Sequence, residues 1–140
     1  MNNLARYSVS FRICDDNLDP LEITQILGVK PNVSHRKGDR NVSWSKKGKP
    51  IELSPHSSGI WIIHSEAGEY VGLEHHLRSL LVVLCPLKDE LLELYIKGYK
   101  MDMFCGVFVS EVHQPGFDIA SDVLLKLGEL KIELSVCIYR

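Results

Sequence analysis

The sequence predicts an α+β fold: a mostly antiparallel sheet with three to four helices packed on one face, in a single domain spanning residues 1–140. A length of 140 residues is typical of one domain, and no internal repeat or linker divides the chain. The apolar pattern switches repeatedly between the two-residue period of strands and the 3.6-residue period of helices. The resulting order, β-α-(loop or β)-β-α-α-β-α-β, favours helices gathered on one face of a sheet.

The first strand and the first helix have the clearest patterns. Apolar and polar residues alternate strictly from Tyr7 to Ile13, which predicts a strand with one wet face. Asp19 precedes a proline and is followed three positions later by a glutamate, the signature of a helix N-cap, and Gly28 supplies a stop. We therefore expect a short helix between Asp19 and Gly28.

The middle of the chain contains the least regular segment. Residues 30–58 have no sustained period and predict a long loop or a ragged hairpin around residues 42–44. Residues 59–64 are apolar on both faces, as expected for an interior strand. Leucines spaced three and four apart then predict two helices, which break at Cys85-Pro86 because proline disfavours helical dihedrals in the residue before it.

The last third of the chain predicts two further strands around a helix. Residues 101–109 and residues 132–138 alternate as strands, and Asp118 is expected to cap the helix, which ends at Gly128. Five residues on the apolar stripes or strands of their segments are predicted to lie in the core: Leu27, Trp61, Leu77, Leu81 and Leu124.

The charge is unevenly distributed. The net charge of −2 gives no global attraction to nucleic acid or to anionic membranes. Residues 30–49 nevertheless carry a local charge of +6, with Asp39 as their single acid, so that the rest of the chain sums to −8. No apolar run approaches the roughly 20 residues of a membrane span, and the N-terminal residues lack a secretory signal, so we expect a cytoplasmic protein.

No sequence motif assigns a chemical reaction. The chain has no nucleophile elbow, phosphate-binding loop or zinc-binding helix, and its four cysteines lack the spacing of a metal site or disulfide framework. We therefore assign no catalytic residue, metal or cofactor and favour a non-enzymatic protein. The loop histidines His35, His56, His64 and His113 keep open the alternative of a metal-independent nuclease that uses acid and base catalysis.

The basic segment is the strongest functional signal. Cationic side chains around an aromatic ring can dock on an acidic protein surface, or neutralise phosphates while a base stacks on the ring. The alternative is a solvated loop that Trp44 anchors to the body of the protein. The predicted partner-binding residues are Lys30, Arg36, Lys37, Arg40, Trp44, Lys46, Lys47 and Lys49.

Two phenylalanines indicate a second surface. Phe104 and Phe108 lie four residues apart on the same side of the last-but-one predicted strand, opposite its core residues. Because soluble monomers tend to avoid exposed apolar patches, we expect this face to pack against a helix or a second copy of the chain. A homo-oligomeric structural protein is therefore a further alternative.

Several local signatures resemble one protein family across nearly the whole chain. The most specific is the run from Asp19 to Pro31, with the pattern DP-x-x-IT-x-x-LG-x-x-P. Further matching features are Lys37-Gly38, Gly59-Ile60-Trp61, the helical pair around Pro86, and Pro115-Gly116-Phe117. Together these features resemble the bacterial domain of unknown function 4279. The resemblance implies a small α+β domain with no established reaction, cofactor or catalytic residue.

A protein-binding module is the function that these observations favour. The partner would be an acidic protein surface or a second copy of the chain, and the low net charge argues against nucleic acid. An immunity protein that neutralises a toxin domain is the specific form of this hypothesis, because small size and the lack of a catalytic motif suit that role.

Overall fold

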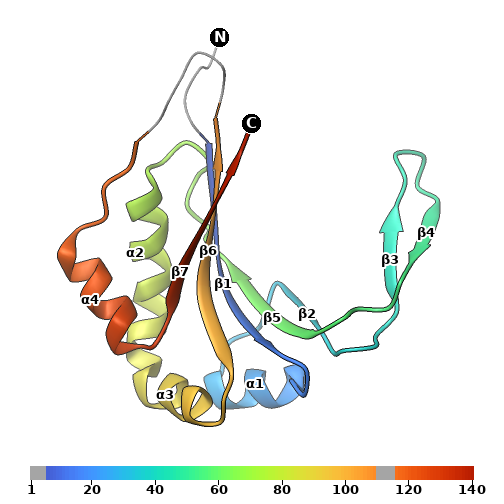
Figure 1. The fold of residues 1–140 in the computed structure, drawn as a ribbon, viewed down its shortest axis with the longest axis horizontal. Coiled ribbons are helices and arrows are strands. Elements are labelled where there is room, and N and C mark those ends of the chain that lie inside the picture. The colour runs from blue at the N-terminus through green and yellow to red at the C-terminus, as the bar shows by residue number, and fades with distance from the viewer. Residues whose placement is uncertain (1–5, 110–115) are drawn as a thin grey trace.

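A computed structural model describes residues 6–109 and 116–140 of the chain. The fold is α+β, with a mixed sheet of five strands and a separate hairpin of two strands (Figure 1). The strands of the sheet are β1 (Arg6–Asp15), β2 (Val33–His35), β5 (Gly59–His64), β6 (Lys100–Phe108) and β7 (Glu133–Tyr139). The hairpin consists of β3 (Asn41–Trp44) and β4 (Pro50–Leu53). The helices are α1 (Pro20–Leu27), α2 (Leu73–Leu84), α3 (Lys88–Ile96) and α4 (Ser121–Glu129), with the 3-10 turn η1 (Cys85–Leu87) between α2 and α3.

The sheet has the strand order β2-β5-β1-β6-β7. The pairs β2–β5, β5–β1 and β1–β6 are antiparallel, which confirms the mostly antiparallel prediction. Strands β6 and β7 are parallel. Helix α4 connects these two strands as a crossover, which allows them to run in the same direction. The sheet is therefore mixed, with a parallel pair at one edge and antiparallel pairs elsewhere.

The described helices pack on the same face of the sheet. One hydrophobic core joins Phe11 and Ile13 of β1 to buried residues of α1, α2, α3 and α4. Trp61 of β5 is fully buried in this core, and its indole Nε1 donates a hydrogen bond of 3.0 Å to the hydroxyl of Thr24 on α1. The core prediction is confirmed for Leu27, Trp61, Leu77 and Leu81.

Helix α1 and the break after α2 form as the sequence predicts. The side chain of Asp19 accepts a hydrogen bond from the backbone N–H of Leu21, Pro20 occupies the first turn, and Gly28 ends the helix with a φ of 68°. Left-handed backbone of this kind favours glycine. The predicted break at Cys85-Pro86 is the turn η1.

Three predictions about α4 are wrong. Asp118 does not cap it: the helix begins at Ser121, and the backbone N–H of Ala120 donates to Glu74 of α2. Gly128 lies inside the helix, and the left-handed residue beyond its end is Lys131, with a φ of 60°. Leu124 is 49% exposed because the buried face of α4 consists of Val123 and Leu127.

Gly59, the first residue of the Gly59-Ile60-Trp61 motif, has to be a glycine for steric reasons. Gly59 begins β5 opposite Asp15 of β1. A Cβ atom at position 59 would lie 2.7 Å from the carbonyl oxygen of Asp15 and 2.9 Å from the Cβ of Leu18. Only glycine allows this approach, with which the chain enters the sheet at the start of β5.

Candidate functional site

The hairpin of β3 and β4 stands apart from the sheet and the helices (Figure 1). We call residues 41–53 the arm. The predicted hairpin around residues 42–44 is confirmed, with Val42 paired with Glu52 and Trp44 paired with Pro50. Every residue of β4 is exposed to solvent. A two-stranded hairpin with no packed face is only marginally stable in water, so the arm requires other constraints.

The turn of the arm carries two lysines at its tip. The backbone N–H of Gly48 donates to the carbonyl of Ser45, and the N–H of Ser45 donates to the carbonyl of Lys49. Gly48 adopts a left-handed φ of 77°, which places Lys46 and Lys47 in the turn. The tip therefore presents side chains that do not take part in the hydrogen bonds of the hairpin.

The predicted basic residues divide into paired and unpaired groups. Arg36 contacts Asp19 at 2.8 Å, Lys37 contacts Asp16 at 3.4 Å, and Arg40 contacts Glu52 at 2.8 Å. The Arg40 guanidinium lowers the pKa of the Glu52 carboxyl group through their hydrogen bonds.

The unpaired basic residues mark the end of the arm. No carboxylate among the described residues lies within ion-pair distance of Lys46, Lys47 or Lys49. Lys30 is predicted with this group but lies elsewhere, beside a pocket lined by Val29 and Leu80. The unpaired charge of the arm therefore gathers at its tip.

Exposed apolar side chains accompany these charges. Trp44 is 68% exposed, and Ile51 and Leu53 of the facing strand are 48% and 45% exposed. The register places Trp44 on one face of the arm and Ile51 and Leu53 on the other. Trp44 does not anchor this segment to the body, because its indole is exposed, while the alternative of a solvated segment without a partner stays a prediction.

The base of the arm is closed by two histidines. The rings of His35 and His56 stack with their centroids 3.5 Å apart and their planes at 13°. The N–H of Gly38 donates to the carbonyl of His56, and the N–H of His56 donates to the carbonyl of Asp39. Burial lowers the pKa of His35, and the neighbouring His56 lowers it further. The sequence predicts that both histidines lie in loops. It does not predict that they stack, because they are 21 positions apart and only the hairpin brings them together.

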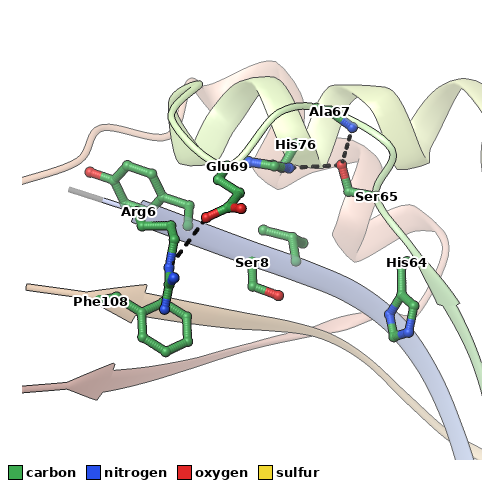
Figure 2. Close-up of a pocket in the computed structure, with 10 residues that line it drawn as sticks. Arg6, Ser8, His64, Ser65, Ala67, Glu69, His76 and Phe108 are labelled. Carbon is green, nitrogen blue, oxygen red and sulfur yellow. Dashed lines mark hydrogen bonds and ion pairs between the residues drawn. The ribbon is translucent and has the colours of Figure 1, made fainter. Parts of the chain in front are cut away.

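A pocket of about 330 Å³ lies at the other end of the sheet, between the start of β1 and the segment after β5 (Figure 2). Ser65 contacts Nδ1 of His76 at 2.8 Å, and Arg6 pairs with Glu69 at 3.6 Å. Burial lowers the pKa of His76, whose Nε2 is buried without a hydrogen-bond partner among the described residues. This nitrogen is therefore shielded from solvent in the pocket.

The remaining loop histidine makes a cross-strand contact. Nδ1 of His64 lies 2.7 Å from the hydroxyl of Ser10, its partner in the register of β1 and β5. The structure therefore brings together His35 and His56 but places His64 with a serine, and His113 lies outside the described residues. Within the described ranges, no group of three or more His, Cys, Asp or Glu is placed to hold a metal ion.

Phe104 and Phe108 lie on the face of the sheet opposite the helices. The guanidinium of Arg12 covers the Phe104 ring, and that of Arg6 covers the Phe108 ring, each at 4.3 Å from the centroid. Tyr139 stacks on Phe108 at 4.8 Å. Arginine and tyrosine side chains, rather than a helix, therefore cover this face in the described residues, and its use by a second copy stays a prediction.

None of the described helices is long and apolar enough to cross a membrane.

Comparisons with known proteins identify one family. No curated protein and no solved structure matches the chain. The model of one family, described as "Domain of unknown function (DUF4279)", matches residues 5–140 and confirms the resemblance seen in the sequence. The chain therefore belongs to the DUF4279 family.

Proposed function

We propose that this protein is a non-enzymatic protein-binding module and that the arm is its docking element. The observation that carries the proposal is the exposure of Trp44 on an isolated hairpin whose tip lysines have no ionic partner among the described residues. A tryptophan in water gains more from burial in an interface than almost any other side chain. Its position beside Lys46, Lys47 and Lys49 specifies the partner: a protein surface with an apolar patch inside an acidic rim.

The two kinds of side chain have different roles in this binding. Trp44 supplies apolar area at the centre of the contact, where most of the binding free energy arises. The lysines act over distance: they raise the association rate and favour acidic partners over basic ones. Their effect weakens as salt shortens the screening length from about 10 Å at 0.1 M to about 3 Å at 1 M.

An immunity role is the specific form of this proposal. In that case the acidic surface belongs to a toxin domain, and the arm blocks it without performing any reaction. The local charge of +6 in residues 30–49 supports attraction to an acidic partner. The remaining charge of −8 on the rest of the chain makes a second copy of this protein another acidic surface that the arm could meet, so the test must include self-association.

Photo-crosslinking in the native host tests the proposal. Trp44 is replaced by a photoreactive phenylalanine analogue, and a matched protein carries the same analogue at Leu124, an exposed apolar site on the body. We expect position 44, and not position 124, to form an adduct with an acidic protein. An adduct with nucleic acid, or equal adducts from both positions, would contradict the proposal.

A further inference from the structure

Four residues fasten the arm to the sheet. We call His35, Gly38, Asp39 and His56 the clip. The segment that enters the arm contributes His35, Gly38 and Asp39, and the segment that leaves it contributes His56. The stacked rings lie 3.5 Å apart, and the two backbone hydrogen bonds of His56 measure 2.7 Å and 3.0 Å. Within the described residues, the clip is therefore the closure at the base of a hairpin that has no packed face.

The clip also sets the direction of the arm. His35 is the last residue of β2 and pairs with Ile60 of β5, so one of the two stacked rings belongs to the sheet itself. His56 lies outside any strand and is fixed by the turn after β2 and by the stack. If the stack separates, the sheet loses this side-chain contact with the segment leaving the arm.

The stack is not compatible with a charge on both rings. Two imidazolium rings face to face at 3.5 Å would repel each other, and burial disfavours a charge on His35. The charged and titratable groups acting on His35 are His56, from the segment after β4, and Asp39, from the turn after β2. The side of β5 contributes the apolar Ile60.

The charged side chains near the two histidines do not compensate for a second positive charge on the stacked rings. Arg36 and Lys37 follow His35 directly, but their side chains pair with Asp19 and Asp16. Backbone hydrogen bonds with Arg36 and Ser58 and the charge of Asp39 favour protonation of His35, but burial and His56 oppose it more strongly, so that the pKa of His35 lies below its ordinary value of 6.5.

We infer that the clip is a proton-sensitive lock on the arm, closed while the His35 ring is neutral and released when that ring takes up a proton in mildly acidic solution. This regulation rests on the proposed function of the arm, because release would remove the fixed orientation that makes docking efficient. The partner class is unchanged: acidification weakens the binding of the same acidic protein surface.

The direction of the effect follows from linkage. A histidine whose pKa is lowered in the closed form takes up its proton more readily in the open form. The closed form is therefore at full strength above about pH 6.5, and its stability is lost as the pH falls toward the lower pKa of the closed form. Over that interval, opening increases by up to about tenfold per pH unit for each proton taken up.

Nuclear magnetic resonance on the free protein tests the lock without any partner. We would measure ring-to-ring Overhauser contacts between His35 and His56, and the protection factors of the Gly38 and His56 amides, at about pH 7.5 and pH 5.5 on either side of the ordinary histidine pKa. In the wild type we expect the ring contact to weaken at the lower pH and amide protection to fall by up to about tenfold.

Matched variants separate protonation from general acid sensitivity. His35→Phe combined with His56→Phe keeps two flat rings that can stack but removes both protonation sites. Its amide protection should not change between the two pH values. His75→Gln removes an exposed histidine on α2 and should behave as the wild type.

Two results would overturn the lock. One is amide protection in the wild type that is independent of pH, and the other is an equal acid-induced loss in the double phenylalanine variant. If that variant does not fold, the ring titration of the wild type decides: a His35 pKa at or above the ordinary 6.5 contradicts the lock. Failure of the crosslinking experiment at Trp44 would instead contradict the docking function and leave these measurements unaffected.

Discussion

The guanidinium of Arg12 lies 4.3 Å from the ring centroid of Phe104, on the face of the sheet that no described helix covers. The same guanidinium donates hydrogen bonds of 2.9 Å and 2.6 Å to the carboxylate of Asp102. Asp102 also accepts a hydrogen bond from Ser135 of β7. One arginine therefore neutralises a half-buried acid and shields an aromatic ring, which lets a single copy of the chain carry Phe104 on an open face.

Replacing Arg12 by alanine should destabilise the fold. The substitution leaves Asp102 partly buried without its bidentate partner and uncovers Phe104. Leaving such a group unsatisfied typically costs about 1–3 kcal/mol. Urea denaturation measures the free energy of unfolding. Arg40→Ala is the control, because it removes the exposed Arg40–Glu52 pair, and it should change stability little. Equal losses in the two variants would show that the covered face has no special role.

Two leucines test the position of the core. Leu81 is 4% exposed, and Leu124 is 49% exposed. Leu81→Ala should lower the free energy of unfolding by about 2–5 kcal/mol, as expected for a buried leucine. Leu124→Ala should change it by less than about 0.5 kcal/mol. A larger loss at Leu124 than at Leu81 in chemical denaturation would mean that α4 presents a different face to the sheet.

Leu124 also shows what the sequence could and could not predict. A single alternation or stripe defines β1, α1 and α2 without ambiguity, and their buried faces are confirmed. In α4, Val123, Leu124 and Leu127 all fit an apolar stripe. The helix buries Val123 and Leu127, and Leu124 faces the solvent. The start of α4 depends on Glu74, a residue 46 positions away, so no local capping signal could identify it.

The candidate site was predicted in composition but not in geometry. Basic residues around Trp44 are visible in the sequence, but their carboxylate partners are not, because Asp19 and Asp16 precede α1. The exposure of Trp44 depends on where the hairpin stands relative to the sheet. The His35–His56 stack depends on the same placement, and so histidines that look scattered in the sequence form a pair in the structure.

The thiol of Cys105 should resist alkylation in the folded protein. All four cysteines are free, but Cys105 is fully buried, and burial raises its pKa to about 12. The thiolate is the reactive form, so at about pH 8 almost none is present. Iodoacetamide treatment followed by mass spectrometry should label Cys105 only after denaturation. Labelling of Cys105 in the native protein at the rate of a free thiol would contradict its burial.

The buried His76 should make the fold sensitive to mild acid. Burial lowers its pKa below the ordinary 6.5, so the unfolded chain takes up the proton first. The contribution of the neutral ring to stability is complete above about pH 6.5 and is lost as the pH falls toward the lower folded pKa.

His76→Leu isolates this effect. The variant loses the hydrogen bond to Ser65 and should be less stable at neutral pH, but its stability should fall less between about pH 7 and pH 5.5 than that of the wild type. Urea denaturation at several pH values measures both slopes. A steeper acid dependence in the variant would show that His76 is protonated in the folded protein.

The most direct test of the docking role of the arm compares two sets of lysines. Lys46→Ala, Lys47→Ala and Lys49→Ala together remove the unpaired charge at the tip, and Lys88→Ala, Lys100→Ala and Lys126→Ala remove the same charge from exposed sites on the body. The measurement is the affinity of each protein, at about 0.1 M and 1 M salt, for the protein crosslinked to position 44. We predict that the tip variant binds more weakly than the wild type, with a smaller dependence on salt, while the body variant binds as the wild type does. Equal binding by the tip variant and the wild type at low salt would contradict the docking role of the arm.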